Sequence, residues 1–117
     1  MQQWKNSKAV FLLSSPEPDF IEGQKNVIKV AKQLGIKHIV KLLSGDADSN
    51  SQFYIPRIHG AVDDYLIKSG INYTILRPMG IMQNWPGDIA KSVKKERKFY
   101  EATGKGKRVH VGLRDIA

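Results

Sequence analysis

Hydroxyl side chains follow two apolar runs of this sequence. Ser14 and Ser15, with Pro16 behind them, come directly after the run 9–13, and Ser44 comes directly after the run 39–43. In an open α/β sheet, ligands bind outside the carboxyl ends of the parallel strands. Small hydroxyl side chains at such ends let a flat ring approach closely and can hydrogen-bond a ribose or an amide. The pattern therefore indicates a candidate binding edge, with ordinary turn composition as the alternative.

Carboxylates are the second group of residues that suggest chemistry. Asp46 and Asp48 share one loop, and Asp63 and Asp64 are adjacent further along the chain. Two aspartates in a loop, without a Glu or His at a matching spacing, are a weak signal for a metal ion. Solvated loop and helix faces explain them better, so we expect no metal site.

A parallel sheet is needed to bring the strand ends together, and the hydrophobic pattern predicts one. Apolar runs predict buried strands at residues 8–14, 39–44 and 72–77, the first of them covered on both faces. Alternating apolar and polar residues predict a less buried fourth strand at residues 109–113. Strands that alternate with helices indicate βαβ units. We therefore expect an α/β fold, namely part of a doubly wound parallel sheet.

The helices between these strands carry recognisable start and stop signals. Asp19 precedes the first helix, with Glu22 at the spacing of a capping box, and Gly35 ends it. Pro56 suits the first turn of the second helix, which Gly70 ends. A third helix is expected over residues 88–98. The predicted core faces of the first two helices are Gly23, Val27, Val30, Ala31 and Leu34, and then Ile58, Ala61, Val62, Tyr65 and Leu66.

Composition narrows the class of protein. The chain has 117 residues, of which 41% are hydrophobic and 26% charged, and this suits one ordinary domain. No apolar run approaches the roughly 18 residues of a membrane span, and the first residues lack the pattern of a signal peptide. The absence of cysteine excludes disulfides and thiolate chemistry and is compatible with a cytoplasmic protein.

The formal net charge of +8 is concentrated late in the chain, in residues 91–98 and at Lys105, Lys107 and Arg108. A basic run of this kind can meet nucleic-acid phosphates. However, no aromatic side chains are interleaved to stack on bases, and a solvated helix face is the simpler interpretation. We therefore expect neither a nucleic acid nor a membrane as partner.

The segment 69–78, continued by 79–84, resembles the NmrA-like branch of the atypical short-chain dehydrogenase/reductases. Residues 10–16 resemble that branch's fourth strand and the turn after it. Further resemblances are to the next helix and fifth strand (24–28 and 35–40) and to a motif that opens a later helix (114–117). The resemblance implies a Rossmann fold that binds NADP or NAD, of which residues 1–117 are a partial domain.

The resemblance also implies roles for further residues. Short-chain dehydrogenases carry a Tyr-x-x-x-Lys pair on the helix after the fifth strand, and here Ile55 and His59 stand at those two positions. Tyrosine-based proton transfer is therefore not expected. His59 is instead the candidate catalytic and cofactor-binding residue, able to bond ribose and to transfer a proton near neutral pH. A histidine without a role is the alternative. Met79 and Gly80 follow the third strand, where the family's backbone passes the nicotinamide.

The Gly-rich turn that holds the pyrophosphate in this family is not found at the expected spacing. Gly104 and Gly106 precede a strand and are expected to form a turn. The chain thus resembles a fragment without the N-terminal Gly-rich half, whose first strand would expose an edge suited to self-association. Three hypotheses follow: an NAD(P)H-dependent quinone- or azo-reductase-like enzyme, a non-enzymatic dinucleotide-sensing regulator, and a truncated product without autonomous activity.

Overall fold

The computed structural model describes residues 4, 6–100 and 104–117. The chain divides into a first unit, Met1–Arg77, and a second unit, Pro78–Ala117. The elements of the first unit are β1 (Ala9–Leu12), α1 (Phe20–Gln33), β2 (His38–Leu42), α2 (Tyr54–Lys68) and β3 (Asn72–Leu76). Those of the second unit are β4 (Gly80–Ile81), the 3-10 helix η2 (Met82–Asn84), α3 (Asp88–Glu96), β5 (His110–Val111) and α4 (Leu113–Ile116). None of the helices described has the length and apolar character needed to cross a membrane.

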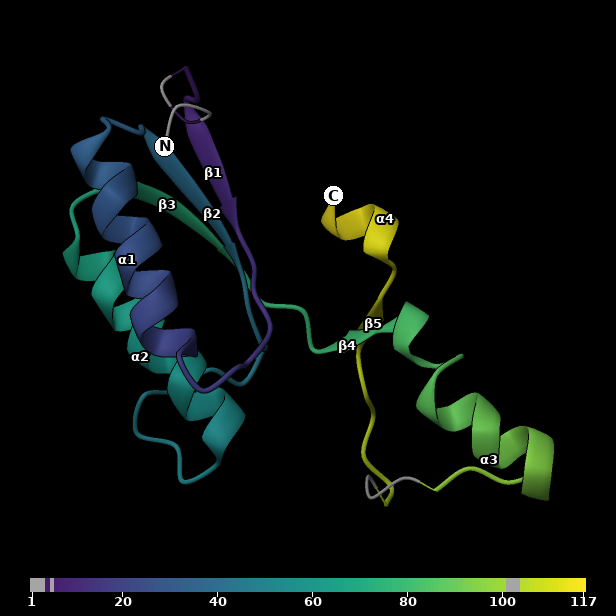
Figure 1. Ribbon diagram of the computed structural model, residues 1–117. Coiled ribbons are helices and arrows are strands. Elements are labelled where there is room, and N and C mark those ends of the chain that lie inside the picture. The colour runs from purple at the N-terminus through teal and green to yellow at the C-terminus, as the bar shows by residue number, and fades with distance from the viewer. Residues whose placement is uncertain (1–3, 5, 101–103) are drawn as a thin grey trace. The chain divides into compact units, whose positions relative to one another are not determined.

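The first unit contains a parallel sheet in the order β1-β2-β3. Val10 is the register partner of Ile39, and Ile39 is the partner of Tyr73. Each strand follows its neighbour in sequence, so both crossovers step in the same direction and place their helices on the same face. Figure 1 shows α1 and α2 side by side on one face of this sheet. The predicted α/β class with parallel βαβ units is confirmed.

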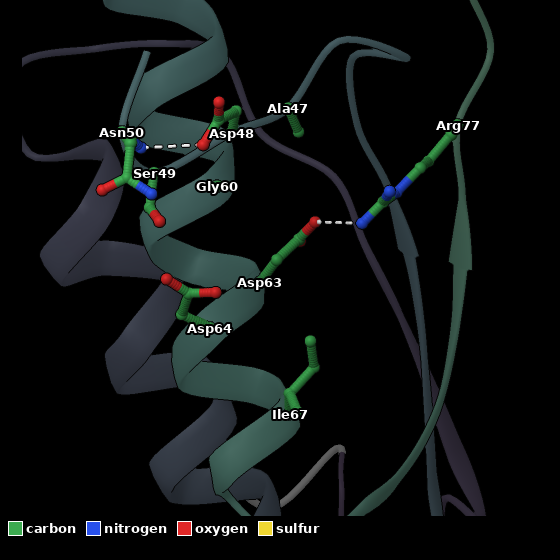
Figure 2. A pocket seen from close by; sticks show the side chains of 9 residues that line it. All are labelled: Ala47, Asp48, Ser49, Asn50, Gly60, Asp63, Asp64, Ile67 and Arg77. Carbon is green, nitrogen blue, oxygen red and sulfur yellow. Dashed lines mark hydrogen bonds and ion pairs between the residues drawn. The ribbon is translucent and has the colours of Figure 1, made fainter.

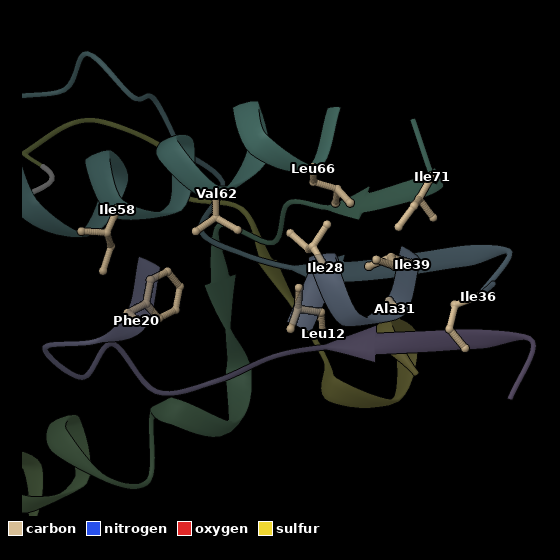
Figure 3. Close-up of a cluster of buried hydrophobic side chains, with 10 residues drawn as sticks. All are labelled: Leu12, Phe20, Ile28, Ala31, Ile36, Ile39, Ile58, Val62, Leu66 and Ile71. Carbon is tan, nitrogen blue, oxygen red and sulfur yellow. The ribbon is translucent and has the colours of Figure 1, made fainter. Parts of the chain in front are cut away.

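Burial in the first unit alternates along β1 because helices of the unit cover one face only. Leu12 points to the helices and is buried, whereas Phe11 is 55% exposed. The core is a single cluster (Figure 3), made of Leu12, Phe20, Ile28, Ala31, Ile36, Ile39, Ile58, Val62, Leu66 and Ile71. The expectation that β1 is covered on both faces is therefore wrong within this unit. So is the expectation that β3 is buried, because its first three residues are exposed.

Helix α1 begins and ends where the sequence predicts, but only the glycine at its end acts as expected, and the predicted capping box at its start does not form. Asp19 is the N-cap residue, yet its side chain makes no capping hydrogen bond, so the predicted capping box is wrong. At the other end Gly35 has φ +72°, and its N–H donates to the carbonyl of Lys32. The N–H of Ile36 donates to the carbonyl of Ala31 at 3.0 Å. This pair of bonds is a Schellman motif, which needs a residue that tolerates positive φ.

The helix faces that pack on the sheet contain more polar residues than the pattern predicts. The buried residues of α1 are Phe20, Gln24, Ile28 and Ala31, so only Ala31 of its predicted face is fully buried. On α2 the predicted Ile58, Val62 and Leu66 are buried, and His59 and Asp63 are buried beside them. A stripe chosen by apolar residues alone misses these positions, because their side chains are accommodated by polar partners or by aromatic packing.

The second unit contains a separate two-stranded parallel sheet, in which Gly80 pairs with His110 and Ile81 with Val111. The predicted strand 109–113 is thus reduced to β5 and does not join the three-stranded sheet. The reason is that β4 provides a partner that the sequence pattern did not reveal. The predicted helix 88–98 is confirmed as α3, which ends at Arg97 in the left-handed conformation. Gly104 lies in a turn, as expected.

Candidate functional site

The carboxyl edge of β1 and β2 carries the predicted hydroxyl groups. Ser14, Ser15 and Pro16 are exposed directly after β1, and Ser44 is half-buried after β2. Because β1 and β2 are parallel neighbours, both sets of residues leave the sheet at the same edge. The Ser44 hydroxyl donates to the carboxylate of Asp46. The structure therefore brings these four predicted residues to one edge, which we call the hydroxyl edge.

Gln24, a buried residue of α1, contacts this edge, although the sequence pattern did not predict its burial. The residue is 2% exposed on the buried face of α1. Its Nε2 donates to the Ser14 Oγ at 3.0 Å, while its Oε1 has no hydrogen-bond partner. A polar residue between apolar ones at helical spacing was the available signal.

His59 lies on the face of α2 that packs against α1. It is 9% exposed, and its ring makes an edge-to-face contact with Phe20 at a centroid distance of 4.8 Å. Burial lowers the pKa of His59 below its ordinary value, and the positive charge of Lys41 lowers it further. The imidazole is therefore neutral at pH 7, with one nitrogen donor and one nitrogen acceptor. Its Nδ1 has no hydrogen-bond partner.

A buried ion network joins the central strand to α2 and to the end of β3. Lys41 is fully buried on β2, and its Nζ lies 2.8 Å from Asp63 Oδ1. Arg77 Nη2 lies 3.5 Å from Asp63 Oδ2. Burial lowers the pKa of Lys41, and the hydrogen bond to Asp63 opposes that shift. A lysine inside the apolar run 39–43 is the sequence signal for this network, and a pattern based on apolar residues alone does not include it.

A cavity of about 310 Å³ lies beside this network. It is formed by the loop after β2, the middle of α2 and the end of β3 (Figure 2), and its lining residues are Ala47, Asp48, Ser49, Asn50, Gly60, Asp63, Asp64, Ile67 and Arg77. Gly60 is required here, because a Cβ would lie 2.1 Å from the backbone nitrogen of Ser49. None of the predicted site residues lines this cavity. Among the described residues, no three His, Asp or Glu side chains group as a metal site would require.

Met79 and Gly80 belong to the second unit. Met79 is 65% exposed, and Gly80 is the first residue of β4. A Cβ on Gly80 would lie 2.6 Å from the His110 ring, so the close approach of β5 already explains a glycine at this position. The packing of β4 against β5 thus accounts for this glycine without reference to a ligand.

A family model described as NAD(P)H-binding matches residues 2–112. The NAD(P)H azoreductase of Xenophilus azovorans is 31% identical over 108 residues, which are 92% of this chain and 37% of that protein. Festuclavine dehydrogenase of Aspergillus fumigatus is 32% identical over 110 residues, 93% of this chain and 37% of that protein. The chain thus spans little more than a third of the length of these curated relatives.

Solved structures show the same fold. A nucleoside-diphosphate-sugar epimerase from Staphylococcus aureus superposes with a TM-score of 0.81 at 24% identity, covering 98% of this chain and 42% of that one. The triphenylmethane reductase of Citrobacter sp., in complex with NADP(H), gives a TM-score of 0.66 at 22% identity, covering 80% and 34%. Since the family model matches nearly all of the sequence, this chain belongs to the NAD(P)H-binding family, as the resemblance to the NmrA-like branch predicted.

Proposed function

We propose that this chain holds the nicotinamide end of NAD(P)H in an oxidoreductase that reduces a flat, quinone-like or azo compound. The observation that carries the proposal is the hydroxyl edge, where Ser14, Ser15 and Ser44 leave two parallel strands on the same side. Ligands of open α/β sheets bind at such an edge. The family to which the chain belongs is NAD(P)H-binding, which supports NAD(P)H as the cofactor. The 31% identity to an NAD(P)H azoreductase supports a reduction as the reaction.

The described residues fit one end of the dinucleotide. Hydroxyl groups that are exposed at a strand end suit the ribose and the carboxamide, and the neutral His59 imidazole can accept or donate one hydrogen bond. By contrast, the turn from β1 to α1 contains Pro16 and Pro18 and has no Gly-x-Gly-x-x-Gly pattern. That pattern lets backbone N–H groups approach a pyrophosphate. The fit is therefore to the nicotinamide nucleoside.

Within this proposal the chain's residues bind and orient, and the bound cofactor supplies the hydride. Ser14 and Ser15 donate or accept hydrogen bonds at the hydroxyl edge, whereas Ser44 accepts them because its proton is donated to Asp46. Pro16 restricts the backbone of the turn that contains the first two serines. His59 acts as a neutral hydrogen-bonding group at pH 7, because its lowered pKa keeps the charged form rare. Met79 and Gly80 are also proposed to bind the cofactor, on the strength of the family resemblance alone.

The test is a titration of the chain with NADPH followed by NMR. We expect shift changes centred on the hydroxyl edge. Each hydrogen bond contributes about 0.5–1.5 kcal/mol, so the double variant Ser14→Ala/Ser44→Ala should raise Kd about tenfold. Ser7→Ala is the matched control, because Ser7 is an exposed serine before the amino end of β1. An unchanged Kd in the double variant would contradict the proposal.

A non-enzymatic dinucleotide sensor is the second candidate, and one observation favours it. Ile55 occupies the position of the catalytic tyrosine, and His59 at the lysine position is buried and neutral. Neither of these two positions on α2 therefore carries a group suited to donating a proton at pH 7. NADPH oxidation measured with a panel of quinones and azo dyes separates the two candidates. Turnover supports the reductase, whereas saturable binding without turnover supports the sensor.

Two broader expectations accompany the proposal. In the described sheet of the first unit β1 is an edge strand, and we propose that copies of the chain associate through this edge. A protein without cysteine that uses NAD(P)H suits the cytoplasm, which we propose as its location.

A further inference from the structure

Gln24 occupies a position on α1 where an apolar residue would be expected. Phe20 and Ile28, one turn before and one turn after it, are both buried in the core. Gln24 itself is 2% exposed, and its Oε1 makes no hydrogen bond. Burying an amide group whose oxygen has no partner costs free energy. Stability alone therefore does not explain a glutamine here.

The contact that Gln24 does make is with the hydroxyl edge. Its Nε2 donates to the Ser14 Oγ at 3.0 Å. A serine hydroxyl has one proton to donate and two lone pairs that accept. Because Gln24 can only donate through Nε2, the Ser14 oxygen acts as acceptor toward the interior through one lone pair. Its proton is then available to a partner outside, together with the second lone pair. Ser14 is exposed, so that partner can be a ligand.

We propose that Gln24 is a positioning residue that keeps the Ser14 proton available for donation outside, so that the end of β1 favours a ligand group with an acceptor oxygen. This inference rests on the proposed function, in which the acceptor is a carboxamide or ribose oxygen of NAD(P)H. The role differs from that of Ser14 itself, because Gln24 lies under the turn and acts only through the serine.

Two substitutions separate polarity from packing. Gln24→Met keeps a similar volume and removes the donor. It should raise the Kd for NADPH about three- to tenfold, because that is the effect of losing one hydrogen bond. Gln24→Glu replaces the donor with an acceptor, so Ser14 must turn its proton inward, and the loss should equal or exceed that of Ser14→Ala. Gln33→Met and Gln33→Glu are the matched controls, because Gln33 is exposed at the end of the same helix.

A double variant shows whether Gln24 acts through Ser14. If it does, Gln24→Met/Ser14→Ala binds NADPH no more weakly than Ser14→Ala alone, whereas additive losses would overturn the inference. The midpoint of urea unfolding gives a second readout. Gln24→Met should unfold at the same or a higher urea concentration, since it removes an unpartnered buried oxygen. If the role of Gln24 were purely structural, the Gln24→Met variant would unfold at a lower urea concentration than the unsubstituted chain.

A measurement without ligand keeps this inference distinct from the proposed function. In the NMR spectrum of the free chain, Ser14→Ala should move the side-chain amide signals of Gln24 and leave those of Gln33 in place. Unmoved Gln24 signals would overturn the positioning role. If those signals move but NADPH causes no shift changes at the hydroxyl edge even far above millimolar concentration, the proposed function and the ligand selection fail together, while the positioning of Ser14 stands.

Discussion

The two units of this chain use their hydrophobic residues in opposite ways. The first unit gathers ten buried residues into one cluster between the sheet and two helices. In the second unit none of the residues whose burial is described is fully buried. Trp85 there is 40% exposed, and its ring contacts Phe99 and His110 at centroid distances of 6.1 and 5.5 Å.

The difference shows where stability and adaptability lie. Regions with few buried apolar contacts open locally at low free-energy cost, whereas packed cores open only with the whole domain. The residues of the hydroxyl edge therefore follow strands that belong to the packed core of the first unit. Met79 and Gly80 belong to the unit with sparse packing, in which β4 and β5 pair over two residues.

The largest effect should come from breaking the buried ion network of the first unit. Asp63→Ala leaves Lys41 buried without its partner, and removing one member of a buried pair costs about 3–5 kcal/mol. Urea unfolding followed by circular dichroism measures this loss. Asp64→Ala is the matched control, because Asp64 is the exposed neighbouring carboxylate and should cost little. Adding Lys41→Met to Asp63→Ala should recover much of the loss, and equal stability of the two Asp variants would refute the network's role.

A pair of leucine substitutions tests the contrast between the units directly. Leu66 is fully buried in the first unit, and Leu113 is 45% exposed in the second. Leu66→Ala should lower the free energy of unfolding by about 2–5 kcal/mol. Leu113→Ala should lower it by less than about 1 kcal/mol. Similar losses in the two variants would mean that the second unit has a core of its own.

Two glycines of the first unit should respond to alanine with opposite signs. Gly35 has φ +72°, which a Cβ disfavours, so Gly35→Ala should destabilise by about 1 kcal/mol. Gly23 lies within α1, with no atom within 4 Å of an added Cβ, so Gly23→Ala should stabilise by roughly 0.5–1 kcal/mol. Thermal melting of both variants is sufficient, and a common sign would disprove the assigned end of α1.

The smallest effect is the pH dependence that His59 imposes. Its folded-state pKa is lowered, first by burial and then by Lys41, from an ordinary value of 6.5. Between the two pKa values the unfolded chain binds more protons, so stability present above pH 6.5 is lost as the pH falls below it. Urea midpoints from pH 8 to pH 5 should therefore decline less steeply in His59→Phe. An equal decline would show that His59 does not titrate in this way.

The elements were largely predictable because their signals are local. Apolar runs located β1, β2 and β3, and Gly35 marked the end of α1 through its positive φ. What the pattern could not give depends on contacts between distant segments. The partner of β5 is a two-residue strand without a periodic signal, and the buried Gln24 donates a hydrogen bond to Ser14, which lies ten residues earlier.

The sequence predicted that the hydroxyl residues meet at one edge of the sheet, but it did not predict the buried residues around them. Ser14 and Ser44 reach one edge because parallel order follows from the alternation of strands and helices. His59 was placed by the family resemblance, but its burial against Phe20 depends on how two helices pack. The ion pair of Lys41 with Asp63 depends on how α2 packs on β2. The sequence pattern could not reveal it, because a charged residue in a helix is expected to be solvated.

The central claim is that the chain holds the nicotinamide end of NADPH without a Gly-rich turn to bind the pyrophosphate. Calorimetric titration of the 117-residue chain with NADPH at about 150 mM salt tests this claim most directly. Each charge-assisted bond to a pyrophosphate contributes roughly 1.5–3 kcal/mol. Without two or three of these bonds, a micromolar site weakens to the millimolar range, so we expect a Kd weaker than about 1 mM. A saturable, micromolar isotherm that salt does not weaken would contradict the account.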